Sequence, residues 1–167
     1  MSLDPELESI RRRLLRDLDR VAEALEGLDD EQIAWKPFEK GSSLIVLVTH
    51  VVGSAQNTVL QLVGEESLRD RDAEFLAPWT ARTVHGEVAV AKARISAALE
   101  RLDPSTLGAG HAAPRTSARP LTVPAVSTQS AGATTTRDFL LQTIAHTAEH
   151  AGHAELTRDL VRARGAS

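Results

Sequence analysis

The stretch FLLQTIAHTAEHAGHAELTRDL, residues 139–160, is the part of the sequence that decides the fold. Alternating steps of four and three residues select one line of side chains along it, and this is the spacing of one face of an α-helix. The line consists of Phe139, Thr143, His146, His150, His153, Thr157 and Leu160. Because both ends of the line are apolar, we expect the histidines between them to face a core. The stretch therefore predicts a long helix that carries imidazoles on its inner face.

Three other segments repeat apolar residues at helical spacing. The first starts with the capping residue Asp4 and with Pro5 at the first helical position. A short extra turn is expected at 31–35. The predicted long helices cover about 5–28, 43–64, 83–102 and 136–164. Two predicted core stripes are Leu7, Ile10, Leu14, Leu18, Val21, Leu25, Leu28 and Val84, Val88, Ala91, Ile95, Ala98, Leu102. Four long amphipathic helices predict an all-α protein, a four-helix bundle, in a single domain that spans residues 1–167.

A long connection separates the third and fourth predicted helices. Residues 104–136 are rich in Pro, Gly, Ser and Thr and have no helical period. Within them, RPLTVPAVSTQ, residues 119–129, is compatible with a short strand or hairpin. Connections of this length inside a compact domain are unusual and tend to be functional. We therefore expect a crossover loop between helices three and four.

The composition excludes several classes of protein. The chain has 167 residues, a formal net charge of −4 and no cysteine. The negative charge disfavours binding to nucleic acid, and the lack of cysteine excludes disulfides and thiol nucleophiles supplied by the chain. We expect no membrane span and no secretory signal, because no apolar run is long enough and the N-terminus is charged. A cytoplasmic location is the default expectation.

A second polar patch lies within the second predicted helix. The line Val46, His50, Gly53, Asn57 and Leu60 has apolar ends and a histidine in its middle. A buried imidazole whose nitrogens lack partners costs about 1–3 kcal/mol. Two such patches that face each other could share one divalent metal, and two histidines four residues apart on a helix can bind the same ion. The alternative is that these histidines are ordinary core residues with hydrogen-bond partners.

The sequence resembles the DinB/YfiT-like superfamily. The similarity is carried by WKPFEKGSSL (35–44) before the central histidine of LVTHVV (47–52), and by ATTTRDFLLQTIAH (133–146) before HTAEHAGHAEL (146–156). The resemblance implies a four-helix bundle whose metal ligands are His50, His146 and His150. It places His153 beside the metal or in a substrate pocket. Asn57 and Glu149 are further candidates for residues that orient a ligand or a water molecule.

The resemblance also implies a chemistry. Members of this superfamily include metal-dependent thiol transferases and mycothiol-dependent isomerases, so we expect a thiol S-transferase, of the mycothiol or bacillithiol type, or an isomerase. Imidazole ligands favour zinc or nickel, with iron and cobalt as alternatives. A low-molecular-weight thiol would supply the sulfur that the chain lacks. The expected partners are a small-molecule substrate and a second copy in a homodimer. Two alternatives remain open: a bundle that binds metal without catalysis, and an interaction module whose histidines only form hydrogen bonds.

Overall fold

A computed structural model describes residues 3–39, 41–66, 69–74, 76, 79–110 and 134–165, apart from the side chain of Arg71. The elements are α1 (Pro5–Glu23), α2 (Asp30–Ala34), α3 (Leu44–Leu62), α4 (Arg71–Glu74), α5 (Val84–Arg101), the 3-10 turn η1 (Pro104–Thr106) and α6 (Thr136–Gly165). Within these ranges there is no strand, and an isolated antiparallel bridge joins Gly110 to Thr135. The all-α prediction is therefore confirmed.

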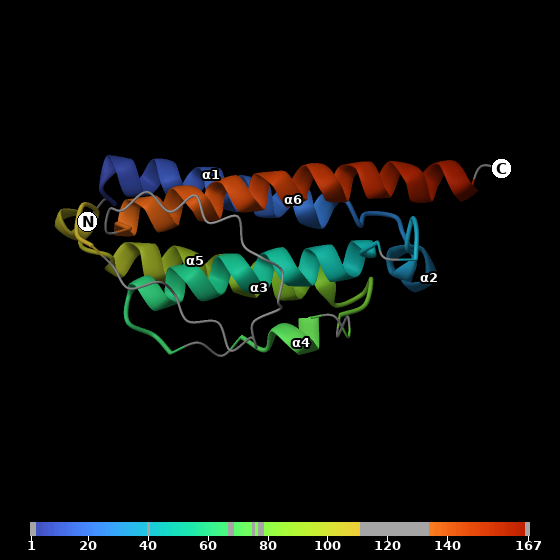
Figure 1. Cartoon of the computed structure of the whole chain (residues 1–167), viewed down its shortest axis with the longest axis horizontal. Coiled ribbons are helices and arrows are strands. Elements are labelled where there is room, and N and C mark those ends of the chain that lie inside the picture. Colours follow the sequence, from blue (N-terminus) through green and yellow to red (C-terminus); the bar gives the residue numbers. More distant parts are fainter. Residues whose placement is uncertain are drawn as a thin grey trace.

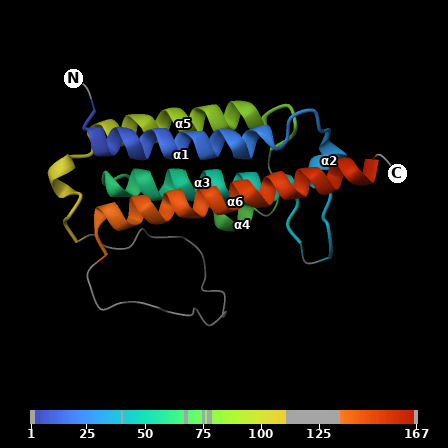
Figure 2. The ribbon, with the colours of Figure 1, turned by 90° about the horizontal axis from the view of Figure 1, so that it is seen from above.

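The long helices α1, α3, α5 and α6 form a four-helix bundle (Figure 1). Each of them packs mainly against two of the others: α1 against α5 and α6, and α3 against the same two helices. Helices α1 and α6 run in one direction and α3 and α5 in the other, which the colours of Figures 1 and 2 show. The short helix α4 lies outside the bundle against α3. The contact between α3 and α6 matters most for function, because it brings the two predicted histidine patches together.

Local signals in the sequence set several helix ends. Asp4 Oδ1 accepts hydrogen bonds from the backbone N–H groups of Glu6 and Leu7, at 2.9 and 3.3 Å, so the predicted cap of α1 is confirmed. Helix α1 ends at Glu23, and the chain then turns at Gly27, whose φ of 74° favours glycine. Asp29 and Gln32 form a capping box that starts α2. The expected extra turn is thus a short helix in its own right.

The core follows the predicted stripes of the first and third long helices. Every member of both stripes is buried. Helix α3 contributes even more buried surface, and it is long and apolar enough to cross a membrane by length and composition alone. However, 61% of that apolar stretch is buried inside the bundle. Its composition is therefore that of a central core helix with neighbours on most sides.

The buried face of α6 differs from the predicted one. Leu160 is 44% exposed and His153 is exposed, so the expectation that the whole line from 139 to 160 points inward was wrong at its C-terminal end. The buried positions instead are Thr136, Leu140, Thr143, Thr147, Ala151, Ala154, Thr157 and Val161. Small and hydroxylated side chains pack against the core here, and the hydroxyls of Thr143 and Thr147 donate to backbone carbonyls four residues earlier. His146 and His150 consequently lie at the edge of the buried face, beside α3.

The connection between α3 and α5 carries a short helix, α4, that was not predicted from the sequence. Helix α3 ends where α5 ends, at the left of Figure 1, so the chain must return along the bundle between them, and α4 lies on this return path. The connection before α6 is long, as expected. The hairpin predicted at 119–129 lies outside the described residues.

Candidate metal centre

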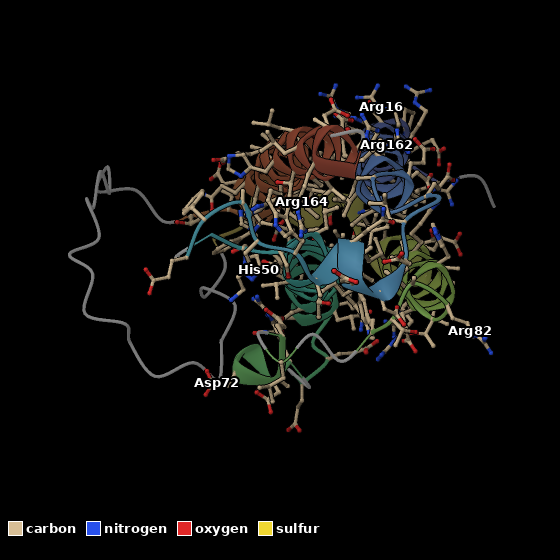
Figure 3. The ribbon with its side chains drawn as sticks, turned by 90° about the vertical axis from the view of Figure 1, so that its right-hand side faces the viewer. Arg16, His50, Asp72, Arg82, Arg162 and Arg164 are labelled. Atoms are coloured by element: carbon tan, nitrogen blue, oxygen red, sulfur yellow. The ribbon has the colours of Figure 1, made fainter. Side chains whose placement is uncertain are left out.

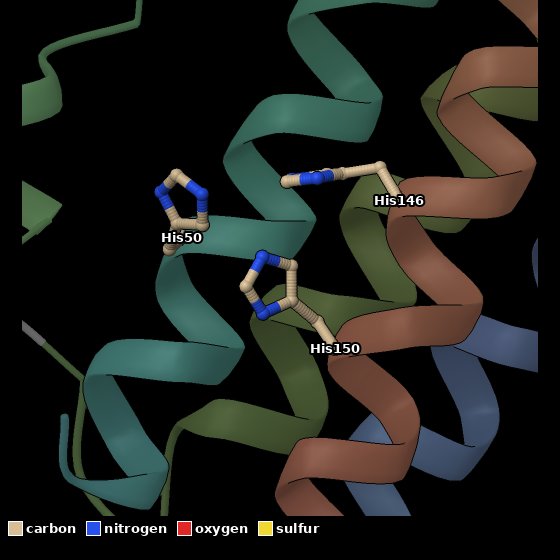
Figure 4. Close-up of side chains that lie close together, drawn as sticks. All are labelled: His50, His146 and His150. Atoms are coloured by element: carbon tan, nitrogen blue, oxygen red, sulfur yellow. The ribbon is translucent and has the colours of Figure 1, made fainter. Parts of the chain in front are cut away.

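Three histidines from two helices converge between α3 and α6. His50 comes from α3, and His146 and His150 come from consecutive turns of α6 (Figure 4). One ring nitrogen of each lies within 4.8 Å of the others. The ring centroids are 5.5 Å apart for His50 and His146, 5.3 Å for His50 and His150, and 4.5 Å for His146 and His150. The geometry thus brings together residues that are far apart in the sequence.

Two nitrogens of this cluster lack partners. His146 Nε2 and His150 Nδ1 are buried and accept or donate no hydrogen bond among the described residues. Such orphaned nitrogens are costly, and a metal ion would satisfy them. Ligand nitrogens about 2.0–2.1 Å from a common ion lie about 3–4 Å from one another, so a small inward movement of the rings suffices. The donor set therefore fits a divalent ion that prefers imidazole.

The environment keeps the rings of α6 neutral. Burial, followed by repulsion from the neighbouring histidines, lowers the pKa of His150 to about 4. Burial and repulsion from His50 also lower the pKa of His146. A neutral imidazole has the lone pair that a metal requires, whereas a protonated one does not. Both residues are therefore in the ligand form at neutral pH before any ion arrives.

A buried ion pair lies on the other side of His50. His50 Nδ1 is 3.1 Å from Glu74 Oε2 and 3.2 Å from Arg69 Nη2. Arg69 donates to both oxygens of Glu74. Burial alone would raise the pKa of Glu74, but the hydrogen bonds from Arg69 and His50 outweigh it and hold that pKa below its ordinary value. Glu74 is therefore a carboxylate, and it faces the nitrogen of His50 that points away from the other two rings.

The structure separates the remaining candidate residues from the cluster. The ring of His153 lies 5.7 Å from that of His150, but it is exposed and is not part of the three-histidine group. Glu149 is exposed as well. Asn57 is buried two turns along α3, where it accepts a hydrogen bond from Gln61 Nε2 at 2.9 Å. His153 and Glu149 thus lie at the surface near the cluster, and Asn57 lies away from it along α3.

A cavity of about 360 Å³ opens between α3, α4 and α5. Its lining includes Asn57, Arg69, Glu74, Trp79, Glu87 and Arg94. Arg69 and Glu74 therefore stand between the cavity and His50. Figure 3, which looks along the bundle, shows α4 beside α3, with His50 labelled near the centre. The ion pair is thus part of the cavity wall on the side of His50.

Sequence reasoning missed Arg69 and Glu74. They belong to the charged stretch RDRDAE, residues 69–74, which has no apolar period and no recognisable motif. One signal for them did exist: Gly53 follows His50 by one turn in the middle of a core helix, where glycine is costly. The missing side chain at position 53 indicates that another group occupies the space beside His50.

Comparison with known protein families identifies the chain's relatives. Residues 9–163 match a family model described as mycothiol-S-transferase. The matched region covers almost the whole chain and includes the three histidines, Arg69 and Glu74. No curated protein matches the chain.

Proposed function

Because the chain belongs to the mycothiol S-transferase family, we propose that it is a divalent-metal-dependent enzyme that transfers a low-molecular-weight thiol to a small electrophile. The observation that carries the proposal is the convergence of one ring nitrogen each from His50, His146 and His150 to within 4.8 Å. The family match supports the thiol chemistry, and the orphaned nitrogens of His146 and His150 support the metal.

The three histidines would hold the ion and leave part of its coordination shell for other groups. Zinc and nickel suit three imidazoles best, with iron and cobalt as alternatives. When bound, the ion would lower the pKa of a thiol and so favour the nucleophilic thiolate. The sulfur must come from a small molecule, because the chain has no cysteine.

The charges around the site support this role. Neutral imidazoles add no charge, and Arg69 and Glu74 cancel each other. The full positive charge of the ion therefore remains available to stabilise a thiolate. We expect His153 and Glu149, which are exposed, to contact the thiol or the electrophile.

The test combines metal analysis with turnover. Untagged protein should contain about one divalent ion per chain and should conjugate mycothiol to monochlorobimane. His146→Ala should lose both the metal and the activity, whereas His85→Ala, which changes an exposed histidine on α5, should keep both. Full activity after chelation would refute the proposal. Stoichiometric metal without turnover on any thiol would instead identify a non-catalytic metal-binding bundle.

A further inference from the structure

The ion pair behind His50 is unusual because it is almost completely buried. The side chains of Arg69 and Glu74 are only 9% and 7% exposed. Arg69 Nε and Nη2 donate to Glu74 Oε1 and Oε2 at 2.5 and 2.8 Å. Removing two charges from water is expensive, so a buried pair is poor at stabilising a fold by itself. A pair that is buried against a candidate ligand suggests a role in orienting that ligand.

The contacts of His50 decide which of its nitrogens carries the proton. Nδ1 faces both Glu74 Oε2 and Arg69 Nη2, at 3.1 and 3.2 Å. A carboxylate only accepts and a guanidinium only donates. The contact with the carboxylate is the shorter of the two, and a hydrogen bond from Nδ1–H to it is charge-assisted, so we assign the proton to Nδ1. The Nδ1–H form leaves the lone pair of His50 Nε2 for a metal.

Gly53 provides the space for this arrangement. A Cβ atom at position 53 would lie 2.5 Å from Glu74 Oε1 and 3.7 Å from Arg69 Nε. No side chain larger than hydrogen fits there while Glu74 stays in place. By contrast, a Cβ atom at Gly152, on α6, would meet no atom within 4 Å. Position 53 must therefore be glycine for Glu74 to keep its place, whereas position 152 has room for a larger side chain.

We propose that Glu74 is a positioning residue for the metal: it accepts the Nδ1 proton of His50, Arg69 holds its carboxylate, and Gly53 leaves the space that it occupies. This inference rests on the proposed function, because it assumes an ion at the three histidines. Metal-bound histidines usually donate their second N–H to such an acceptor, and loss of the acceptor typically weakens metal binding 10–100-fold.

The first experiment needs no metal. In the metal-free full-length protein, ¹⁵N NMR of the histidine rings should show His50 as the Nδ1–H tautomer. Glu74→Gln keeps the shape but removes the charge, and it should shift His50 toward a mixture of tautomers. Asp72→Asn changes an exposed acid of the same short helix and should leave the spectrum unchanged. An Nε2–H tautomer in the wild type, or identical spectra for wild type and Glu74→Gln, would overturn the inference.

The second experiment uses the two glycines as a matched pair. Gly53→Ala should weaken zinc binding 10–100-fold, measured by competition with a chromogenic chelator, and should alter the visible absorption of the Co²⁺-loaded protein. The melting temperature without metal is measured alongside, because alanine is the better helix former but displaces a carboxylate that two hydrogen bonds hold. Gly152→Ala should keep the zinc affinity and the cobalt spectrum of the wild type.

The outcomes separate this inference from the proposed function. If the wild type binds no ion, the proposed function fails, and the tautomer of His50 still decides whether Glu74 orients it. If the wild type binds zinc and both Glu74→Gln and Gly53→Ala bind it equally well, the proposed function stands and the positioning role is wrong. A fall in melting temperature with unchanged zinc affinity would identify a purely structural ion pair.

Discussion

Replacing His150 by glutamine, which does not titrate, should reduce the loss of stability of the metal-free protein at acidic pH. In the unfolded chain this histidine takes up a proton at its ordinary pKa of about 6.5. In the folded protein burial and the neighbouring histidines lower its pKa to about 4. Between these two values the unfolded state binds more protons than the folded state. Stability is therefore complete above the unfolded pKa and is lost as the pH falls toward the folded one.

The size of the effect follows from the same shift. Each pKa unit corresponds to about 1.4 kcal/mol, so His150 alone should cost about 2 kcal/mol of unfolding free energy between pH 7 and pH 5. The ring is partly exposed, and solvent screening reduces this to about 1 kcal/mol. The comparison stops at pH 5 because carboxylates with lowered pKa values, including Glu74, contribute in the same direction below that pH.

The assay is urea unfolding followed by circular dichroism, in the presence of a chelator, at pH 7 and pH 5. The wild type should lose about 1 kcal/mol more than His150→Gln over this interval. His85→Gln removes an exposed histidine and should lose as much as the wild type. The lowered pKa of His146 contributes in the same direction in all three proteins. Equal losses in the wild type and in His150→Gln would refute the assignment of a buried, neutral ring at position 150.

Three further results are expected. Zinc at a thousand times its dissociation constant should raise the unfolding free energy by about 4 kcal/mol, and His146→Ala should abolish the increase in urea unfolding. A zinc effect that survives in His146→Ala would mean that the ion binds elsewhere. Asp4→Ala should destabilise the protein by about 1 kcal/mol, because it removes the cap from the N–H groups of Glu6 and Leu7, and a change in thermal unfolding tests this. Leu14→Ala should cost about 2–5 kcal/mol by chemical denaturation because Leu14 is fully buried, and a cost below about 1 kcal/mol would contradict its position in the core.

Most of the bundle could be predicted from the sequence, because aliphatic residues at helical spacing mark the buried faces of its helices. The stripe from Leu7 to Leu28 and the stripe from Val84 to Leu102 are made of aliphatic residues, and both are buried as expected. In α6 the rule failed at His153 and Leu160. Apart from Leu140 and Val161, the inner face there consists of alanines and threonines. These side chains are hardly more hydrophobic than those of an exposed helix face, so the larger side chains misled the assignment.

The candidate site also contains residues that could be predicted from the sequence and residues that could not. The convergence of His50 with His146 and His150 was expected from the resemblance to the DinB/YfiT-like superfamily, and helical spacing had already placed each histidine within a polar patch on one face of its helix. Glu74 and Arg69 could not be predicted, because a four-residue helix in a charged connection has no period of its own. Their position depends on tertiary contacts with α3, and only the glycine at position 53 hints at them.

The convergence of the histidines of α3 and α6 has a consequence for the stability of the protein in the cell. His50 and His146 are separated by about a hundred residues of chain, so an ion held by both would behave as a removable cross-link across a very long loop. Closing such a loop restricts the unfolded ensemble more than the folded one. The abundance of intact protein would then rise and fall with the supply of the ion.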